Sequence, residues 1–62
     1  MNLRLVDPDG YTVPGTVHTN VPADNEQKIR ALLEDAAVKD ADAWADFGHD
    51  ARFYRIVTDP TT

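Results

Sequence analysis

The sequence has no cysteine and no serine, and only three of its 62 residues are glycine. Without cysteine, the fold has neither a disulfide nor a thiolate metal site, which small domains often use for stability. Covalent catalysis would then depend on threonine or lysine, and no recognisable motif surrounds either residue type. The glycines form no phosphate-binding pattern. We therefore predict that the protein is not an enzyme and binds no cofactor.

Long apolar runs are also missing. Met1 is followed by Asn2, Leu3 and Arg4 and then by a turn, which is unlike a signal peptide. No stretch approaches the roughly 18 apolar residues that cross a bilayer. We expect a cytoplasmic protein without a membrane partner.

Basic residues are scarce, since six lysines and arginines face 11 acidic residues and the net charge is -5. The phosphates of a nucleic acid would be repelled, so direct nucleic-acid binding is disfavoured. The many aspartates and alanines, with only two lysines, suggest a GC-rich coding source such as a bacterium or its phage.

The length allows one core, because chains near 60 residues bury only about 60% of their unfolded surface. The run Asp7-Pro8-Asp9-Gly10 predicts a tight turn that joins strands over residues 3–6 and 11–13 into a hairpin. Pro14 and Gly15 interrupt the second strand, and we expect it to resume over residues 16–19 at a sheet edge or bulge.

A helix is predicted to begin near Asp24, which is the expected N-cap, with Gln27 completing a capping box. The residues that form its apolar stripe are Ile29, Leu32, Leu33 and Ala36. Asp40 falls where the next core residue is due, so we expect a break there and a short second helix over residues 41–47. That helix would turn Trp44 and Phe47 toward the core and end at Gly48. A continuous helix over residues 24–47 is the alternative.

Residues 52–58 are rich in aromatic and β-branched side chains, which predicts a last strand with apolar side chains on both faces. One helical layer covers only one face of a sheet, so the other face needs loops or another molecule. The predicted architecture is a single α+β domain over residues 1–58 in ββαβ order. An antiparallel sheet of about three strands would pack on one main helix and a short second helix. Residues 59–62 are predicted to be a flexible tail.

Two groups of residues could suggest an ion-binding site, but a purely structural role explains each of them better. His18, His49 and either Asp46 or Asp50 could bind a metal after folding, but no spacing supports this. The Asp40-Ala41-Asp42 run resembles the start of a calcium loop, which fails because Ala45 stands where glycine is required. We predict no metal site.

Two surfaces are candidates for binding a partner. The acidic surface comprises Asp40, Asp42, Asp46 and Asp50, which could dock a basic protein. The second candidate comprises Phe53 and Val57, because aromatic and apolar residues on two strand faces often mark an interface.

The favoured function is therefore a small non-catalytic protein-interaction module or regulator. One alternative is an acidic inhibitor, for example one encoded by a phage, that imitates DNA and occupies a nucleic-acid-binding protein. The other is a structural subunit that assembles with itself, for example as a homodimer.

Overall fold

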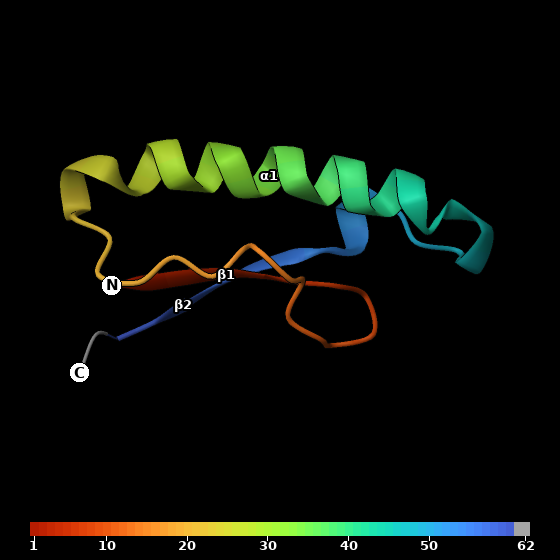
Figure 1. The fold of residues 1–62 in the computed structure, drawn as a ribbon, viewed down its shortest axis with the longest axis horizontal. Coiled ribbons are helices and arrows are strands. Elements are labelled where there is room, and N and C mark those ends of the chain that lie inside the picture. The colour runs from red at the N-terminus through yellow and green to blue at the C-terminus, as the bar shows by residue number, and fades with distance from the viewer. Residues whose placement is uncertain (61–62) are drawn as a thin grey trace.

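A computed structural model describes residues 1–60 of the chain (Figure 1). Two strands and one long helix form its framework, and three single turns of 3-10 helix connect them. In chain order the elements are β1 (Asn2–Val6), η1 (Ala23–Asn25), α1 (Glu26–Ala43), η2 (Ala45–Phe47), η3 (Ala51–Phe53) and β2 (Arg55–Asp59). The predicted α+β class and the single main helix are confirmed.

The sheet consists of β1 and β2, paired antiparallel from Asn2 opposite Asp59 to Val6 opposite Arg55. Helix α1 lies along one face of this sheet (Figure 1). Leu3 and Leu5 alternate along β1 and are 0% and 1% exposed, as expected for residues that face the helix. The fold therefore has two layers, with the core between helix and sheet.

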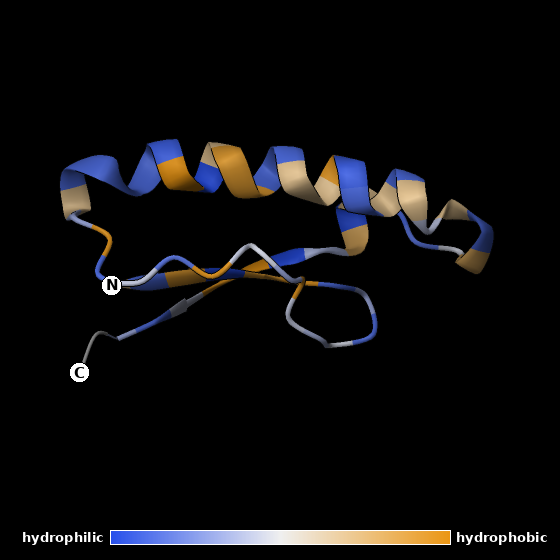
Figure 2. Ribbon diagram, in the orientation of Figure 1, coloured by the Kyte–Doolittle hydropathy of each residue, from blue (hydrophilic) through white to orange (hydrophobic). Residues whose placement is uncertain are grey.

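The core depends on small residues in the helix as much as on large ones. Leu33 is 1% exposed, and Ala37 and Ala41 follow it at intervals of four and are also buried. Leu32, which the sequence places in the apolar stripe, is instead 53% exposed. Figure 2 shows hydrophobic residues in the strands and at several positions along α1. Small and large apolar side chains of α1 therefore share the core with the sheet.

The segment after the predicted turn does not form a regular third strand. Within residues 1–60, its strand-like pairing with β1 is limited to two isolated bridges, Val6 with Thr12 and Leu3 with His18. Between these bridges Pro14 has no N–H to donate, and Gly15 has a positive φ of 79°. The predicted interruption is therefore present, but it prevents regular pairing on both sides.

The side chain of buried Thr16 makes hydrogen bonds in a region where a regular third strand would pair with β1. Its hydroxyl donates to the carbonyl of Val13 (2.6 Å) and accepts from the amide of Leu5 (3.2 Å). The side chain is 4% exposed. A side-chain hydroxyl thus satisfies a β1 amide that a continuous strand would have paired.

The predicted break at Asp40 is wrong, because α1 runs without interruption from Glu26 to Ala43. The alternative of a continuous helix is closer, although only the single turn η2 follows it and Gly48 ends that turn at a φ of 82°. The predicted cap is also absent. Asn25, not Asp24, precedes the helix, and it makes no side-chain capping hydrogen bond.

The last strand begins at Arg55, three residues later than predicted. Asp50 accepts a hydrogen bond from the Arg52 amide (3.0 Å) and so caps the turn η3. The residues of this turn are therefore helical, although the sequence predicts part of them as strand. At its other end β2 includes Asp59, whose carboxylate lies 3.1 Å from Arg4 Nε. The first residue of the predicted tail therefore pairs in the sheet, and residues 61 and 62 lie outside the described part of the chain.

Within residues 1–60, no helix combines the length and the apolar composition that crossing a membrane requires.

Candidate binding groove

The turn between β1 and Tyr11 contains two carboxylates and is held together by hydrogen bonds to one of them. Asp7 Oδ1 accepts hydrogen bonds from the amides of Asp9 (3.0 Å) and Tyr11 (2.9 Å). Gly10 donates to the Asp7 carbonyl (3.0 Å) and has a φ of 93°, which glycine adopts without strain. The Asp-Pro-Asp-Gly turn predicted from the sequence is therefore formed.

The end of α1 supplies two further rings. Trp44 follows the helix and Phe47 closes the turn η2, and their ring centroids are 5.4 Å apart. Both residues were predicted to face the core, but Trp44 is 48% exposed and Phe47 is 73% exposed. The helix continues through Asp40 without a break, and its last buried residue is Ala41. Trp44 and Phe47 follow this residue and are not directed into the core.

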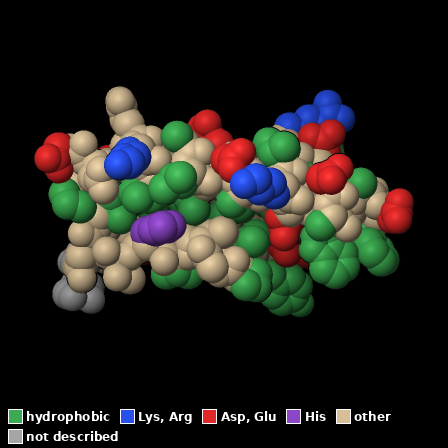
Figure 3. Space-filling model, turned by 45° about the horizontal axis from the view of Figure 1, so that its top comes forward, with side chains coloured by type: hydrophobic (Ala, Val, Ile, Leu, Met, Phe, Trp, Pro, Cys, Tyr) green, Lys and Arg blue, Asp and Glu red, His purple; other side chains and the backbone are tan. Residues whose placement is uncertain are grey.

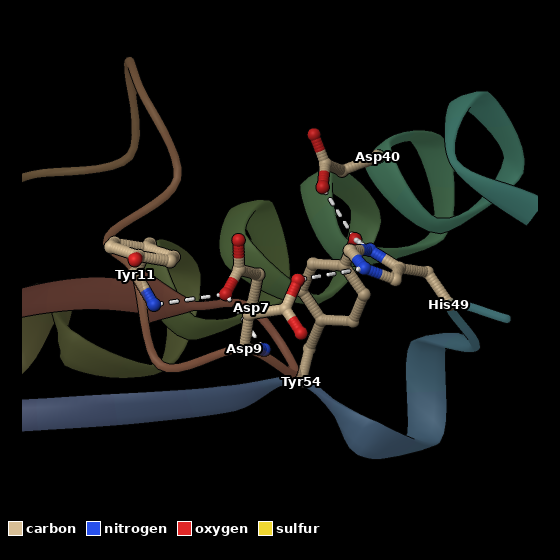
Figure 4. A network of polar contacts seen from close by, with 6 residues as sticks. All are labelled: Asp7, Asp9, Tyr11, Asp40, His49 and Tyr54. Carbon is tan, nitrogen blue, oxygen red and sulfur yellow. Dashed lines mark hydrogen bonds and ion pairs between the residues drawn. The ribbon is translucent and has the colours of Figure 1, made fainter. Parts of the chain in front are cut away.

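His49 joins the turn to the rest of the fold through a chain of polar contacts (Figure 4). Its Nε2 lies 3.3 Å from Asp9 Oδ2, and its Nδ1 lies 3.3 Å from the hydroxyl of Tyr54. That hydroxyl donates to the carboxylate of Asp40 on α1. One side-chain network thus connects the turn, the helix and the residue that precedes β2.

Which of the two His49 contacts are hydrogen bonds depends on the hydrogens of the imidazole. The Tyr54 hydroxyl has one hydrogen, which goes to Asp40, so its oxygen can only accept from His49 Nδ1. The carboxylate of Asp9 can likewise only accept from Nε2. Both contacts are hydrogen bonds at once only when His49 is the imidazolium cation.

Tyr54 is kept neutral by its surroundings. Burial of its ring, which is 8% exposed, is the main reason that its pKa lies well above the ordinary tyrosine value. The hydrogen bond to Asp40 and the charge of that carboxylate raise the pKa further, with smaller contributions from Asp7 and Asp9. Tyr54 therefore serves as a hydrogen-bond donor that fixes Asp40, and it carries no charge near neutral pH.

A groove of about 590 Å³ opens between the turn and the end of α1. The turn contributes Tyr11, and the helix end contributes Trp44 and Phe47. In Figure 3 the hydrophobic side chains gather at this end of the molecule, with acidic side chains between them. The acidic lining residues are Asp7, Asp9 and Asp40.

Among the four predicted acidic residues, only Asp40 lines this groove. Asp42 and Asp46 are exposed on the last turn of α1 and on η2. Asp50 caps η3 and lies 3.5 Å from Arg52 Nε. The structure therefore does not bring the four carboxylates together as one site.

The two predicted apolar residues are also separate from the groove. Phe53 is 51% exposed, and the guanidinium of Arg52 lies 5.1 Å from the centre of its ring. Val57 lies in β2 opposite Arg4 and is half-buried. Their predicted role in an interface stays a prediction.

Sequence reasoning missed the groove because its parts are distant in the chain. Asp9 and His49 are 40 positions apart, and no local pattern connects them. Tyr11, which the sequence places at the start of the second predicted strand, is 72% exposed. Within residues 1–60, no group of three or more histidine, aspartate or glutamate side chains is placed so that it could hold a metal ion, and the backbone of His18 pairs with that of Leu3.

The structure is thus a small two-layer α+β domain with an open groove lined by aromatic and acidic residues. No family model matches the chain, and no curated protein or solved structure matches it either. We therefore infer its function from the chemistry of the groove.

Proposed function

We propose that the protein is a small non-catalytic protein-interaction module that binds its partner through the groove between the turn and the end of α1. One observation carries this proposal. Three aromatic residues, Tyr11, Trp44 and Phe47, line the same groove and are all about half exposed or more.

Aromatic side chains are usually buried, either in a core or in an interface. The exposed rings of this small chain therefore favour a partner that covers them. Each ring has about 150–250 Å² that can be buried, and aromatic residues dominate the energy of many interfaces. Grouped exposed apolar side chains, rimmed by polar groups, commonly mark an interaction site. The polar network beneath the groove fixes the turn against the helix, so the rings stand on a preorganised surface.

The test is affinity capture with matched variants. Tagged wild-type protein would be compared with Phe47→Ala, which removes a ring of the groove, and with Phe53→Ala, which removes an exposed ring elsewhere. We expect a captured partner to be lost with Phe47→Ala and retained with Phe53→Ala. Equal capture by all three proteins would refute the groove as the binding surface.

The two other functions predicted from the sequence give different results in the same experiment. An acidic inhibitor that imitates DNA would lose its partner in an Asp42→Lys, Asp46→Lys double variant and retain it in Phe47→Ala. A self-assembling subunit would capture a second copy of the chain, and the change Phe53→Asp or Val57→Asp would weaken that capture.

A further inference from the structure

We propose that the groove accepts an arginine side chain from the surface of its protein partner. This inference rests on the proposed function and adds the chemistry of the residue that is recognised. It depends on the charge of the groove, on the open carboxylate oxygens and on the arrangement of the rings.

The groove has an excess of negative charge. Its lining includes three carboxylates and one imidazole, and neither lysine nor arginine is among the lining residues of the described chain. Even with His49 protonated, the lining keeps a net charge of about -2. Charge complementarity therefore favours a cationic group over a neutral or an anionic one.

In each carboxylate of the groove, one oxygen contacts a neighbouring polar group and the other makes no hydrogen bond within residues 1–60. Asp7 uses Oδ1 for two backbone amides, while Asp9 and Asp40 use Oδ2 for His49 and Tyr54. Among residues 1–60, no side chain makes a hydrogen bond or an ion pair with the second oxygens. In Figure 4 the open oxygen of Asp40 points away from Tyr54. These oxygens are acceptors that are held in position before a ligand arrives.

The rings provide the second half of the recognition. Trp44 and Phe47 are tilted by 53° to each other, and the His49 ring centroid lies 6.3 Å from that of Trp44. Tyr11 lines the groove from the turn. A cation within about 6 Å of an aromatic face is attracted to it, and tryptophan gives the strongest attraction.

Arginine fits this combination better than lysine does. The guanidinium is planar, so one of its faces can stack on a ring while its edge donates two parallel hydrogen bonds to a carboxylate. The ammonium of lysine is a compact, strongly hydrated point charge that cannot make both contacts in this way.

The openness of the walls favours a partner protein over a free small molecule. Tyr11 is 72% exposed and Phe47 is 73% exposed, so a small ligand would leave both rings in water. Small-molecule sites usually bury most of the ligand surface. A side chain that projects from a protein surface would fill the groove while that surface covers the rings.

The test uses two capped pentapeptides, Gly-Gly-Arg-Gly-Gly and the same peptide with citrulline, which is isosteric with arginine but neutral. Binding is followed by the fluorescence of Trp44, the only tryptophan of the chain, and by amide chemical shifts. We expect a saturable change with the arginine peptide at Tyr11, Trp44 and His49, and a response at least about threefold weaker with citrulline.

Matched variants separate the groove from general attraction to an acidic protein. Asp9→Asn and Asp42→Asn remove the same charge, but only Asp9 lines the groove. Phe47→Ala and Phe53→Ala form the corresponding aromatic pair. We expect Asp9→Asn and Phe47→Ala each to weaken binding of the arginine peptide by about three- to tenfold, and their controls to leave it unchanged.

Each other outcome overturns the inference. Equal binding of the citrulline peptide would show that the groove recognises peptides without a cation, which leaves the proposed function intact. Equal loss in Asp9→Asn and Asp42→Asn would show general electrostatic attraction. Absence of binding would exclude arginine as the recognised residue, and the capture experiment with Phe47→Ala would decide separately on the proposed function.

Discussion

Replacing Tyr54 with phenylalanine removes one hydroxyl and leaves the buried ring in place. The hydroxyl donates to the carboxylate of Asp40, and its oxygen lies 3.3 Å from His49 Nδ1. A hydrogen bond to a charged group contributes about 1.5–3 kcal/mol to stability. Asp40 is only half-buried and can regain water, so we expect a loss near the lower end, about 1.5–2 kcal/mol.

This loss is large for a chain of 62 residues, whose total free energy of unfolding is about 3–9 kcal/mol. Urea unfolding followed by circular dichroism is the assay. With a slope near 1 kcal/mol per molar urea, the midpoint should fall by about 1.5–2 M. Tyr11→Phe is the matched control, because Tyr11 is 72% exposed and its hydroxyl has no partner among residues 1–60.

The dependence on pH gives a second readout. The pKa of Tyr54 is raised in the folded state, chiefly by burial and then by Asp40. Its stabilising contribution is complete below the unfolded pKa of about 10, and it is lost as the pH rises above that value, because only the unfolded state releases the proton. The loss approaches about 1.4 kcal/mol per pH unit. The gap between wild type and Tyr54→Phe should therefore narrow above pH about 10.

A stability loss under about 0.5 kcal/mol at neutral pH would refute this account of the network, since that is the ordinary effect of a surface substitution. A gap that stayed constant from pH about 8 to about 11 would refute the assigned protonation of Tyr54.

Three further predictions concern the core, the edge of β1 and the groove. Leu33→Ala should cost about 2–5 kcal/mol in urea unfolding, whereas the exposed Leu32→Ala should cost under about 0.5 kcal/mol. Thr16→Val should cost about 1–3 kcal/mol because it leaves the backbone amide of buried Leu5 unpaired, and Thr16→Ser should restore most of that loss; equal stability of the two variants would contradict this. Asp40→Asn should lower the pKa of Tyr54, measured by tyrosinate absorbance, and an unchanged titration would exclude the carboxylate as a cause.

The turn could be predicted from the sequence because its determinants are local. Asp7 bonds amides two and four positions away, and Gly10 supplies the positive φ that the turn needs. The interruption at Pro14 and Gly15 follows from the same backbone chemistry. The periodicity of the sequence did not reveal that the buried hydroxyl of Thr16 accepts the hydrogen bond of the Leu5 amide, which a regular third strand would otherwise accept.

The helix was misjudged because a polar residue in the apolar stripe was taken as a break. Asp40 occupies that position, and its partner, Tyr54, lies 14 positions along the chain. A tertiary hydrogen bond therefore satisfies the carboxylate and allows the helix to continue. The exposure of Trp44 and Phe47 follows from this continuation, and so does the groove.

The predicted start of the last strand was wrong for the opposite reason. The sequence contains a local capping signal, but the prediction followed the β propensity of the residues after it. Phe53 and Tyr54 favour extended structure, yet Asp50 caps the preceding residues into a turn of 3-10 helix. Phe53 consequently lies outside the sheet and is exposed.

Site-specific photo-crosslinking in native cells tests the central claim most directly. A photoreactive phenylalanine would replace Phe47 in one variant and Phe53 in another, since both rings are exposed and only Phe47 lines the groove. We predict a discrete adduct with a partner protein at position 47 and none at position 53. An adduct at position 53 alone would contradict the proposal that the groove is the binding surface.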